Sequence, residues 1–321
     1  MKKLFFILII MILNNYMCER NPSSPNNNNS FSIHLLKDPS FTISDIIETD
    51  IDDLEIKNEA WIETEDIDFY DYSTHCIYLK NNKNVYFREE LGISMNNQPF
   101  LVISNSKRHY IGSFHGGALA IAPTHPYIDE LSINFFPSDV LYIAPSWNSD
   151  SVDVRNNMYI RENLENLDKL HEGLTLTITE IQIVDNSDTS TVKYKYIIKN
   201  NDQDDLLVID PQKMGSDLFH YYTNGINFSG EGIIIGSKYK TVSAPDPFDS
   251  WELDWFTKIQ AGHKMERTVT LKGYPKIPKG QYNCLFRFAN PTNIEKESRY
   301  KDDARIWIGY IKSKPKVVEI N

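Results

Sequence analysis

The sequence predicts a mainly β chain, in which a small α+β domain is followed by an antiparallel β-sandwich. Tyr and Phe are plentiful, at 18 and 16 residues, and aromatic or β-branched side chains pack well on a pleated sheet. Apolar and polar residues alternate through the second half, most clearly from Val192 to Ile198, and a period of two is typical of half-buried strands. The 321 residues are enough for about two domains.

The first half predicts strands separated by short helices. A hairpin is expected with its turn at Asn105–Lys107. Helical turns are expected to start at Ser44 and Thr64, because a hydroxyl can cap exposed backbone N–H groups, and to run to Ile47 and Tyr70. The expected strands cover residues 31–36, 75–80, 100–104, 108–114 and 140–143.

Two further helices are predicted. One covers Val85–Leu91 and would end at Gly92. The other covers Met158–His171, where leucines three residues apart share one helical face and Gly173 is a natural stop. Because this second helix would connect the two domains, the boundary is expected near residue 170. The predicted domains are residues 31–170 and 171–321.

The second half predicts about eight short strands, a pattern typical of a β-sandwich. The alternation slips by one residue between Leu174–Ile178 and Ile181–Ile183, which indicates a β-bulge. Asn224-Gly225 is a strong turn signal. The expected strands cover residues 174–183, 192–198, 206–209, 221–228, 232–239, 265–271, 281–289 and 305–311.

Two resemblances sharpen this fold prediction. The segment Lys276–Cys284, with the order Lys-Ile-Pro-Lys-Gly-Gln-Tyr-Asn-Cys, resembles a strand entry of many bacterial immunoglobulin-like domains. The resemblance extends over residues 170–320 and implies an immunoglobulin-like sandwich. The order of elements in the first half resembles the periplasmic head modules of Sec-type export accessory proteins.

The N-terminus predicts export. Two lysines precede the unbroken apolar run Leu4–Leu13, which has the build of a secretory signal and is short for a membrane span. Cys18 lies just past this run. The segment resembles a bacterial lipoprotein signal, which implies that Cys18 is lipidated. Because Asn15-Tyr16-Met17 replaces the usual Leu-Ala-Gly, cleavage elsewhere and an uncleaved anchor stay open.

These features divide the N-terminus into a signal, residues 1–18, and a flexible tether, residues 19–30. The tether is rich in Asn, Pro and Ser and has no apolar period, so it cannot bury surface. We therefore expect an exported protein that lies in the periplasm or at the cell surface and is attached to the membrane by its N-terminal lipid.

The charge argues against a nucleic-acid partner. The net charge is −11, whereas a phosphate backbone requires clustered Lys and Arg. The short basic runs Lys276–Lys279 and Lys312–Lys316 are interpreted as solvated strand ends and turns. Cys76 and Cys284 are interpreted as separate buried thiols, which behave as small hydrophobic residues.

No motif predicts catalysis or a metal. His109, His115 and His125 are close in sequence, but their spacing matches no metal site. Ser113 and His115 lack a surrounding nucleophile elbow. The loop Asp210–Asp217 offers oxygen ligands for calcium but lacks the alternating carboxylates of an EF-hand. We therefore predict no catalytic residue, no metal and no cofactor.

The loop of residues 245–256 is the strongest candidate binding surface. Exposed aromatic residues beside carboxylates can stack on sugar rings or anchor a protein partner. The alternative is a loop folded over one end of the core. The candidate ligand-binding residues are Phe248, Asp249, Trp251, Asp254 and Trp255.

Together these features favour a cell-envelope lipoprotein that acts as a non-catalytic binding or structural module for a protein or a glycan. Two alternatives stay open. One is an exported hydrolase with a site at the inter-domain cleft that uses His115 or His220, and the other is a proteinase inhibitor.

Overall fold

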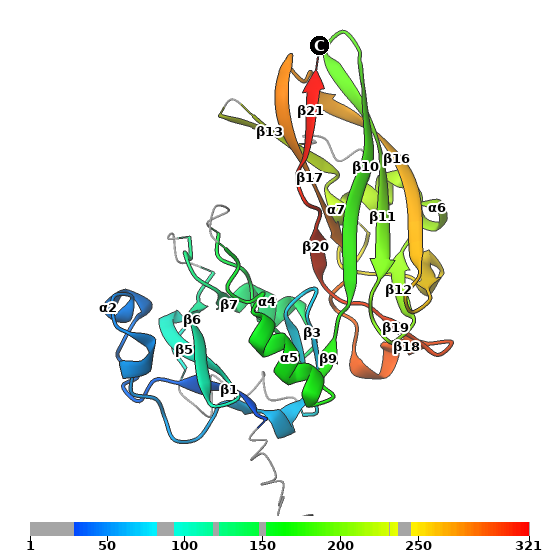
Figure 1. Cartoon of the computed structure of the whole chain (residues 1–321). Coiled ribbons are helices and arrows are strands. Elements are labelled where there is room, and N and C mark those ends of the chain that lie inside the picture. The colour runs from blue at the N-terminus through cyan, green and yellow to red at the C-terminus, as the bar shows by residue number, and fades with distance from the viewer. Residues whose placement is uncertain are drawn as a thin grey trace, which may run out of the picture.

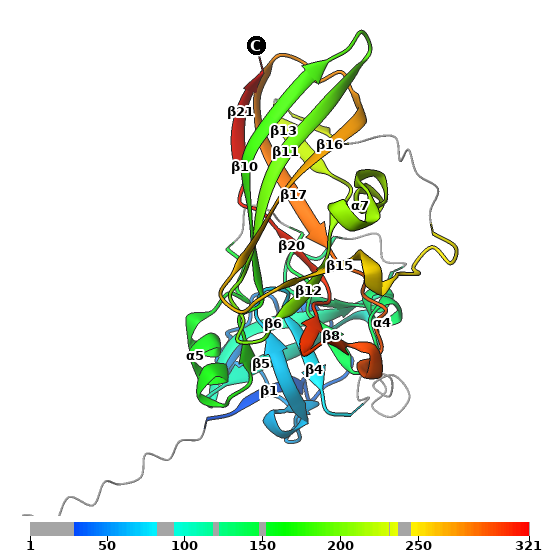
Figure 2. The ribbon, with the colours of Figure 1, turned by 90° about the vertical axis from the view of Figure 1, so that its right-hand side faces the viewer.

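The computed structural model describes residues 29–81, 93–117, 122–147, 152–230, 232–236 and 245–320. The molecule is mainly β and has two lobes, an N-terminal lobe of residues 29–171 and an elongated C-terminal lobe of residues 172–320 (Figure 1 and Figure 2). The predicted signal, most of the predicted tether and the predicted helix Val85–Leu91 lie outside the described residues.

The N-terminal lobe contains two sheets, with strand orders β2-β1-β5-β6-β7 and β8-β4-β3-β9. Its strands are β1 (Phe31–Leu35), β2 (Ile62–Glu63), β3 (Ile67–Asp71), β4 (Cys76–Leu79), β5 (Asn96–Ser104), β6 (Lys107–His115), β7 (Tyr127–Asp129), β8 (Val140–Tyr142) and β9 (Leu170–His171). Its helices are α2 (Ile43–Ile46), α4 (Glu130–Phe135) and α5 (Met158–Asn166), with 3₁₀ turns η1 (Ile51–Asp53) and η2 (Thr64–Asp66).

The predicted strands and hairpin of this lobe are confirmed, but two helix predictions are corrected. The first helical turn exists, yet its N-cap is Thr42, whose backbone N–H donates to Asp45 at 2.8 Å, and not Ser44. The turn at Thr64 ends after η2, because the following residues, which are mostly buried, pair with β4 and continue as β3.

The predicted connecting helix is also shorter than expected. It ends at Asn166, and the chain then turns through Asp168, which has a positive φ of 52°. Leu170 and His171 instead pair in parallel with Tyr70 and Asp71 of β3. Pairing with the sheet therefore overrides the helical spacing of the leucines at this point.

The C-terminal lobe contains three sheets, with strand orders β10-β11-β16, β14-β13-β17-β20 and β15-β12-β19-β18, and β21 also pairs with β17. The strands up to β15 are β10 (Leu174–Asp185), β11 (Thr189–Asn200), β12 (Leu206–Ile209), β13 (Ile226–Gly230), β14 (Ile233–Ile235) and β15 (Phe256–Ile259). The later strands are β16 (Lys264–Pro275), β17 (Gly280–Ala289), β18 (Tyr300–Lys301), β19 (Ala304–Ile306), β20 (Tyr310–Lys312) and β21 (Lys316–Ile320). The helices are α6 (Pro211–Met214) and α7 (Ser216–Thr223), with 3₁₀ turns η3 (Leu253–Trp255) and η4 (Lys296–Ser298).

Most strand predictions in this lobe are confirmed, including the bulge in β10, where the pairing register shifts between Ile178 and Glu180. The strand expected over residues 221–228 is correct only for residues 226–228, which belong to β13, because α7 extends to Thr223 and Asn224 is its left-handed C-cap. The strand expected over residues 305–311 is two strands, β19 and β20, interrupted where Gly309 takes a φ of 113°.

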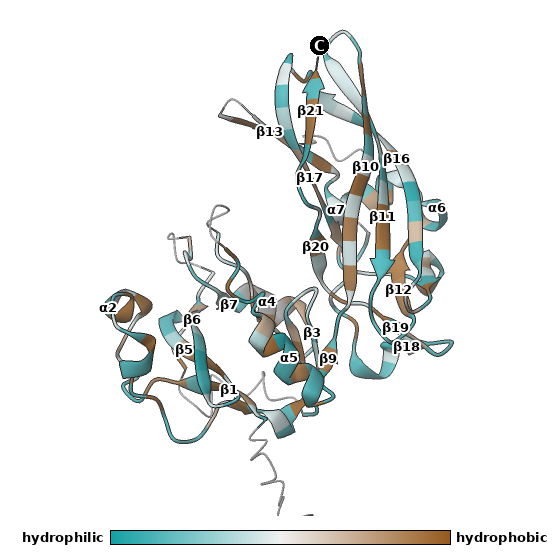
Figure 3. Ribbon diagram, viewed as in Figure 1, coloured by the Kyte–Doolittle hydropathy of each residue, from teal (hydrophilic) through white to brown (hydrophobic). Residues whose placement is uncertain are grey.

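The core joins the two lobes. The largest cluster of buried hydrophobic residues includes Tyr78 and Tyr142 of the N-terminal lobe as well as Tyr196 and Phe288 of the C-terminal lobe. The domain boundary near residue 170 therefore stays a prediction. Figure 3 shows hydrophobic and hydrophilic residues alternating along the long strands of the C-terminal lobe.

Two smaller points follow from the described residues. Cys76 and Cys284 are both buried and free, as predicted. No helix among the described residues is long and apolar enough to cross a bilayer.

Candidate functional site

The two lobes enclose a cleft, which we call the inter-lobe cleft. It consists of two adjoining hollows of about 360 and 690 Å³. Ser73, Asn156, Ile311 and Lys312 line both hollows. Concave sites between two structural units are frequent places for ligands, so the inter-lobe cleft is the first candidate site.

Two buried ion pairs fix the lobes on either side of this cleft. Both terminal nitrogens of Arg299 donate to the Asp139 carboxylate at 2.9 Å. Arg305, which is fully buried, donates to Asp202 at 2.8 Å and lies 3.5 Å from Asp71 in the other lobe. Charged hydrogen bonds of this kind are strong and directional, so they hold the cleft in a defined shape.

The smaller hollow is polar at its floor. Arg155 donates from Nε and Nη2 to the Asp153 carboxylate at 2.9 and 2.6 Å, and from Nη1 to the Ile143 carbonyl at 2.5 Å. Burial alone would raise the pKa of Asp153, but the hydrogen bonds and charge of Arg155 outweigh this effect and lower it. Burial, with a smaller contribution from Arg155, lowers the pKa of His75 to about 3.

Lys312 also lines the smaller hollow, and a second cation, Arg287, lies beside it on the neighbouring strand. Arg287 of β17 and Lys312 of β20 are direct partners in the antiparallel register, so their side chains share one face. The Arg287 guanidinium lies 3.5 Å from the centre of the Tyr310 ring, and Tyr310 lines the hollow. Partial burial, together with Arg287 and Arg155, lowers the pKa of Lys312.

The larger hollow runs beside the edge of a sheet. Five consecutive residues of β10, Leu174–Ile178, line it. Leu174 and Leu176 face the core, whereas Thr175 is exposed. Because core-facing and exposed residues of β10 both line the hollow, the hollow lies along the edge of the strand and not over one of its faces. Lys314, Pro315 and Lys316 form part of the opposite wall.

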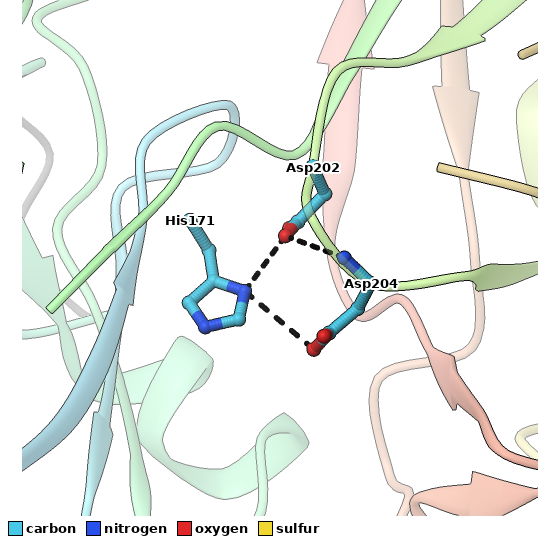
Figure 4. A group of neighbouring side chains, drawn as sticks. All are labelled: His171, Asp202 and Asp204. Carbon is cyan, nitrogen blue, oxygen red and sulfur yellow. Dashed lines mark hydrogen bonds and ion pairs between the residues drawn. The ribbon is translucent and has the colours of Figure 1, made fainter. Parts of the chain in front are cut away.

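A cluster of one imidazole and two carboxylates lies at the junction of the lobes, beside the chain that connects β9 with β10 (Figure 4). His171 Nδ1 is 2.8 Å from Asp202 Oδ1 and 3.8 Å from Asp204 Oδ2. Burial raises the pKa of Asp202, but the hydrogen bond with His171 and the Arg305 charge outweigh it and lower this pKa.

This junction cluster fits a structural role better than a metal site. Arg305 already occupies the second oxygen of Asp202 and lies 3.9 Å from Asp204. A guanidinium at this distance supplies the positive charge that a divalent ion would bring, and it would repel such an ion. The cluster therefore belongs to the contacts that join the lobes.

The predicted aromatic loop is only partly exposed. Trp251 and Trp255 are half-buried and pack against the main core. Trp251 meets Phe256 edge-on, with ring centres 5.8 Å apart, and Trp255 lies 6.0 Å from Tyr222. The two tryptophans therefore neither project freely into solvent nor lie fully within the core.

The rest of that loop is attached to the lobe by hydrogen bonds. Tyr221 donates to the Phe248 carbonyl at 3.0 Å, and Asn293 donates to the Asp249 carbonyl at 3.0 Å. The Phe248 side chain itself is 59% exposed, and Asp254 is exposed. The loop is thus a folded cover over one part of the lobe that leaves Phe248 and Asp254 accessible.

Ser113 and His115, which are close in the sequence, do not form the hydrogen-bonded pair that nucleophilic catalysis would need. Ser113 Oγ shares a hydrogen bond with His125 Nε2 at 2.7 Å, and not with His115. His115 lies 3.4 Å from Asn97, and His109 lies near Ser104. Ser113 is fully buried, so the pair anchors the segment before β7 and offers no accessible nucleophile.

The two remaining candidates lie away from the inter-lobe cleft. The Asp210 carboxylate of the proposed calcium loop accepts hydrogen bonds from Arg267 at 2.7 and 2.5 Å and from Thr257 at 2.6 Å. The oxygens of this carboxylate are therefore occupied by hydrogen bonds from the protein itself. Neither His115 nor His220 is among the residues that line the two hollows of the cleft. These two histidines therefore do not form the hydrolase site that was considered for the cleft.

Sequence reasoning missed the cations of the cleft. Lys312 and Lys314 are exposed, as predicted for a solvated strand end, but the sequence did not indicate that the alternate lysines of this run also line the cleft. The places of Arg155 in the cleft and of Arg287 beside Lys312 carried no sequence signal, because they depend on contacts between segments far apart in the chain.

Comparisons with protein-family models, with curated proteins and with solved structures gave no match for this chain.

Proposed function

We propose that this chain is an exported, membrane-tethered binding protein that captures a negatively charged ligand in the inter-lobe cleft without transforming it. The supporting observation is that Lys312, which lines the smaller hollow, is the cross-strand partner of a second cation, Arg287. The ligand would belong to a protein or a glycan of the cell envelope.

Like charges placed opposite each other on neighbouring strands destabilise a sheet. Within the described part of the chain, neither Arg287 nor Lys312 has an acidic partner, although acidic residues outnumber basic ones by 44 to 33. An anion bound between the two side chains would relieve their repulsion, whereas the nearby Arg155 is already paired with the Asp153 carboxylate. The cleft therefore favours ligands with a carboxylate, sulfate or phosphate group.

The lining of the cleft supports binding and not catalysis. His75, the one histidine among the lining residues that the structure describes, is fully buried and shares a hydrogen bond with Tyr70 at 3.0 Å. A histidine whose pKa is about 3 is a weak general base at neutral pH. Asp153 is held by Arg155.

The proposal can be tested with inorganic sulfate as the probe and full-length protein. Sodium sulfate replaces sodium chloride at constant ionic strength, and the midpoint of thermal unfolding is measured for wild type, Lys312→Gln and Lys193→Gln. Lys193 is an exposed residue of β11 and serves as the matched control. Sulfate stabilises proteins in general by exclusion from their surface, whereas site binding saturates with concentration.

We expect a saturable rise of the midpoint in wild type and in Lys193→Gln. In Lys312→Gln only the unsaturable rise should remain. Equal saturable responses in all three proteins, or none in wild type, would contradict an anion site in the cleft.

The membrane tether is a separate part of the proposal. Residues 1–28 lie outside the described residues, so its support is the sequence of the signal and Cys18. Labelling of the native host with a fatty acid should mark wild type and leave Cys18→Ala unlabelled. Equal labelling of both proteins would remove Cys18 as the lipid attachment site.

We assign the C-terminal lobe to an immunoglobulin-like sandwich and the N-terminal lobe to a small α+β module. The contacts that support the sandwich join two sheets, with the rings of Tyr194 and Tyr196 of β11 lying 5.1 and 5.2 Å from Phe286 of β17.

A further inference from the structure

The larger hollow is bordered by a strand edge that has no partner. Strand β10 pairs with β11 along its whole length, from Leu174 to Asp185. On its other side, no strand among the described residues pairs with it. Every second residue of such an edge directs its backbone N–H and C=O groups outward, and in β10 those groups face the hollow that residues 174–178 line.

The facing wall is an interrupted edge of the second sheet. Strand β20 pairs with residues 287–289 of β17, and β21 pairs with residues 280–284. Between them, Ser313 bonds to Phe286, and Pro315 has no backbone N–H to offer. This wall is therefore a poor template for strand pairing, whereas β10 has a regular register as far as its bulge at Ile178 and Glu180.

The charges beside the free edge are mainly positive. Lys312, Lys314 and Lys316 line the larger hollow, and within the described ranges none of them has an acidic partner. Glu172, the one acid among the lining residues, forms an ion pair with Arg161. Lysines next to an edge discourage pairing with another basic strand, and they attract an acidic one.

The hollow also has the dimensions and the apolar surface for an extended chain. Five residues of β10 correspond to about 16 Å of strand at roughly 3.3 Å per residue. Tyr72, Leu176, Ile178 and Ile311 supply apolar contacts along this length. The cationic smaller hollow adjoins one end, because the two hollows share Lys312.

We propose that the inter-lobe cleft binds an extended acidic peptide segment that adds as a strand to the free edge of β10, with its carboxylates on the lysines of the facing wall. This inference rests on the proposed function and names the ligand class for the same cleft. Addition of a strand to an exposed sheet edge is a common mode of peptide recognition. The free backbone groups of β10 match the repeat of a second strand, which a glycan or a phosphate does not reproduce.

The experiment uses full-length protein and three fluorescent synthetic peptides, each of about ten residues, followed by fluorescence anisotropy. The first alternates Glu with Val and has a free C-terminal carboxylate. The second and third peptides have the same sequence as the first. The second carries N-methyl groups on the backbone nitrogens of the odd-numbered residues, and the third carries them on the even-numbered residues. An added strand donates to β10 from one of these two sets of residues and directs the other set to solvent.

We expect the unmodified peptide to bind, one N-methylated peptide to bind similarly, and the other to lose at least tenfold in affinity. Lys314→Gln and Lys316→Gln should each weaken the unmodified peptide severalfold, whereas the exposed control Lys193→Gln should not. Equal binding of all three peptides would overturn strand addition and leave the anion-binding cleft standing. Absence of peptide binding together with a preserved sulfate response would overturn the peptide as ligand, and loss of both responses would overturn the proposed function as well.

One further result would contradict the inference. If the free edge serves a second copy of this chain, sedimentation at increasing concentration will show a dimer, and the dimer will dissociate in Lys314→Gln or Lys316→Gln. The peptide proposal predicts a monomer in all three proteins under these conditions.

Discussion

The cations between the lobes and the cations in the cleft have opposite surroundings. Arg299 and Arg305 are buried, and each contacts at least one carboxylate at 2.9 Å or less. Arg287 and Lys312 lie side by side on a strand pair and form no ion pair among the described residues, although the Asp153 carboxylate, which Arg155 holds, acts on Lys312 from the same hollow. The cations that join the lobes thus come with their counter-charges, whereas the exposed Arg287–Lys312 pair leaves room for the counter-charge of the proposed ligand.

The largest expected effect is the loss of a matched cation. In Arg305→Met, the buried carboxylates of Asp202 and Asp71 lose the guanidinium that neutralises them. Removal of one partner from a buried pair costs about 3–5 kcal/mol. Denaturant unfolding should show this loss for Arg305→Met and a change within about 0.5 kcal/mol for Arg287→Met. Similar losses in both variants would remove the distinction between the two groups.

The next effect is a pH dependence that arises at the cleft floor. The folded protein lowers the pKa of His75 to about 3, whereas an unfolded histidine titrates near 6.5. Between pH 6.5 and 3 the unfolded chain therefore binds a proton at His75 that the folded chain does not bind. The free energy of unfolding is highest above pH 6.5 and falls as the pH drops toward 3. The slope should approach about 1.4 kcal/mol per pH unit.

His75→Asn should remove most of that slope. Asn is chosen because residue 75 has a positive φ of 57°, which Asn tolerates better than most residues. Unfolding by denaturant at several pH values measures the slope in both proteins. An unchanged slope in His75→Asn would assign the acid sensitivity to other groups.

A smaller effect separates the two kinds of residue in the aromatic loop. Trp255 packs against the core, whereas Phe248 is 59% exposed. Trp255→Ala should lose about 2 kcal/mol of stability through lost packing, and Phe248→Ala should change it little. If Phe248→Ala and Asp254→Ala instead abolish binding of the acidic peptide with stability unchanged, the ligand site lies on this loop and not in the cleft.

The sequence predicts the strands better than the surfaces between them. The alternation in β10 and β11 is a local signal, and even the bulge at Ile178 could be predicted from it. Asn224-Gly225 was ambiguous, because the same left-handed backbone that suits a hairpin turn also ends a helix. Here Asn224 follows the end of α7, and the aromatic residues before it did not predict a helix.

The site could not be predicted because its contacts join distant segments. The pairing of Arg287 with Lys312 depends on β17 and β20 being neighbours in one register, and Arg155 comes from the other lobe. Ser113 pairs with His125 instead of the nearer His115, because β7 returns beside β6. Such placements follow from topology, which the local pattern of residues does not specify.

The most direct test of the account is the coupling energy between Arg287 and Lys312. Unfolding free energies are measured for wild type, Arg287→Gln, Lys312→Gln and the double variant, in low salt and again with saturating sulfate. The account predicts a repulsive coupling of about 0.3–1 kcal/mol in low salt that becomes favourable when sulfate is bound. A coupling that is zero or attractive without sulfate, and the same with it, would contradict the account.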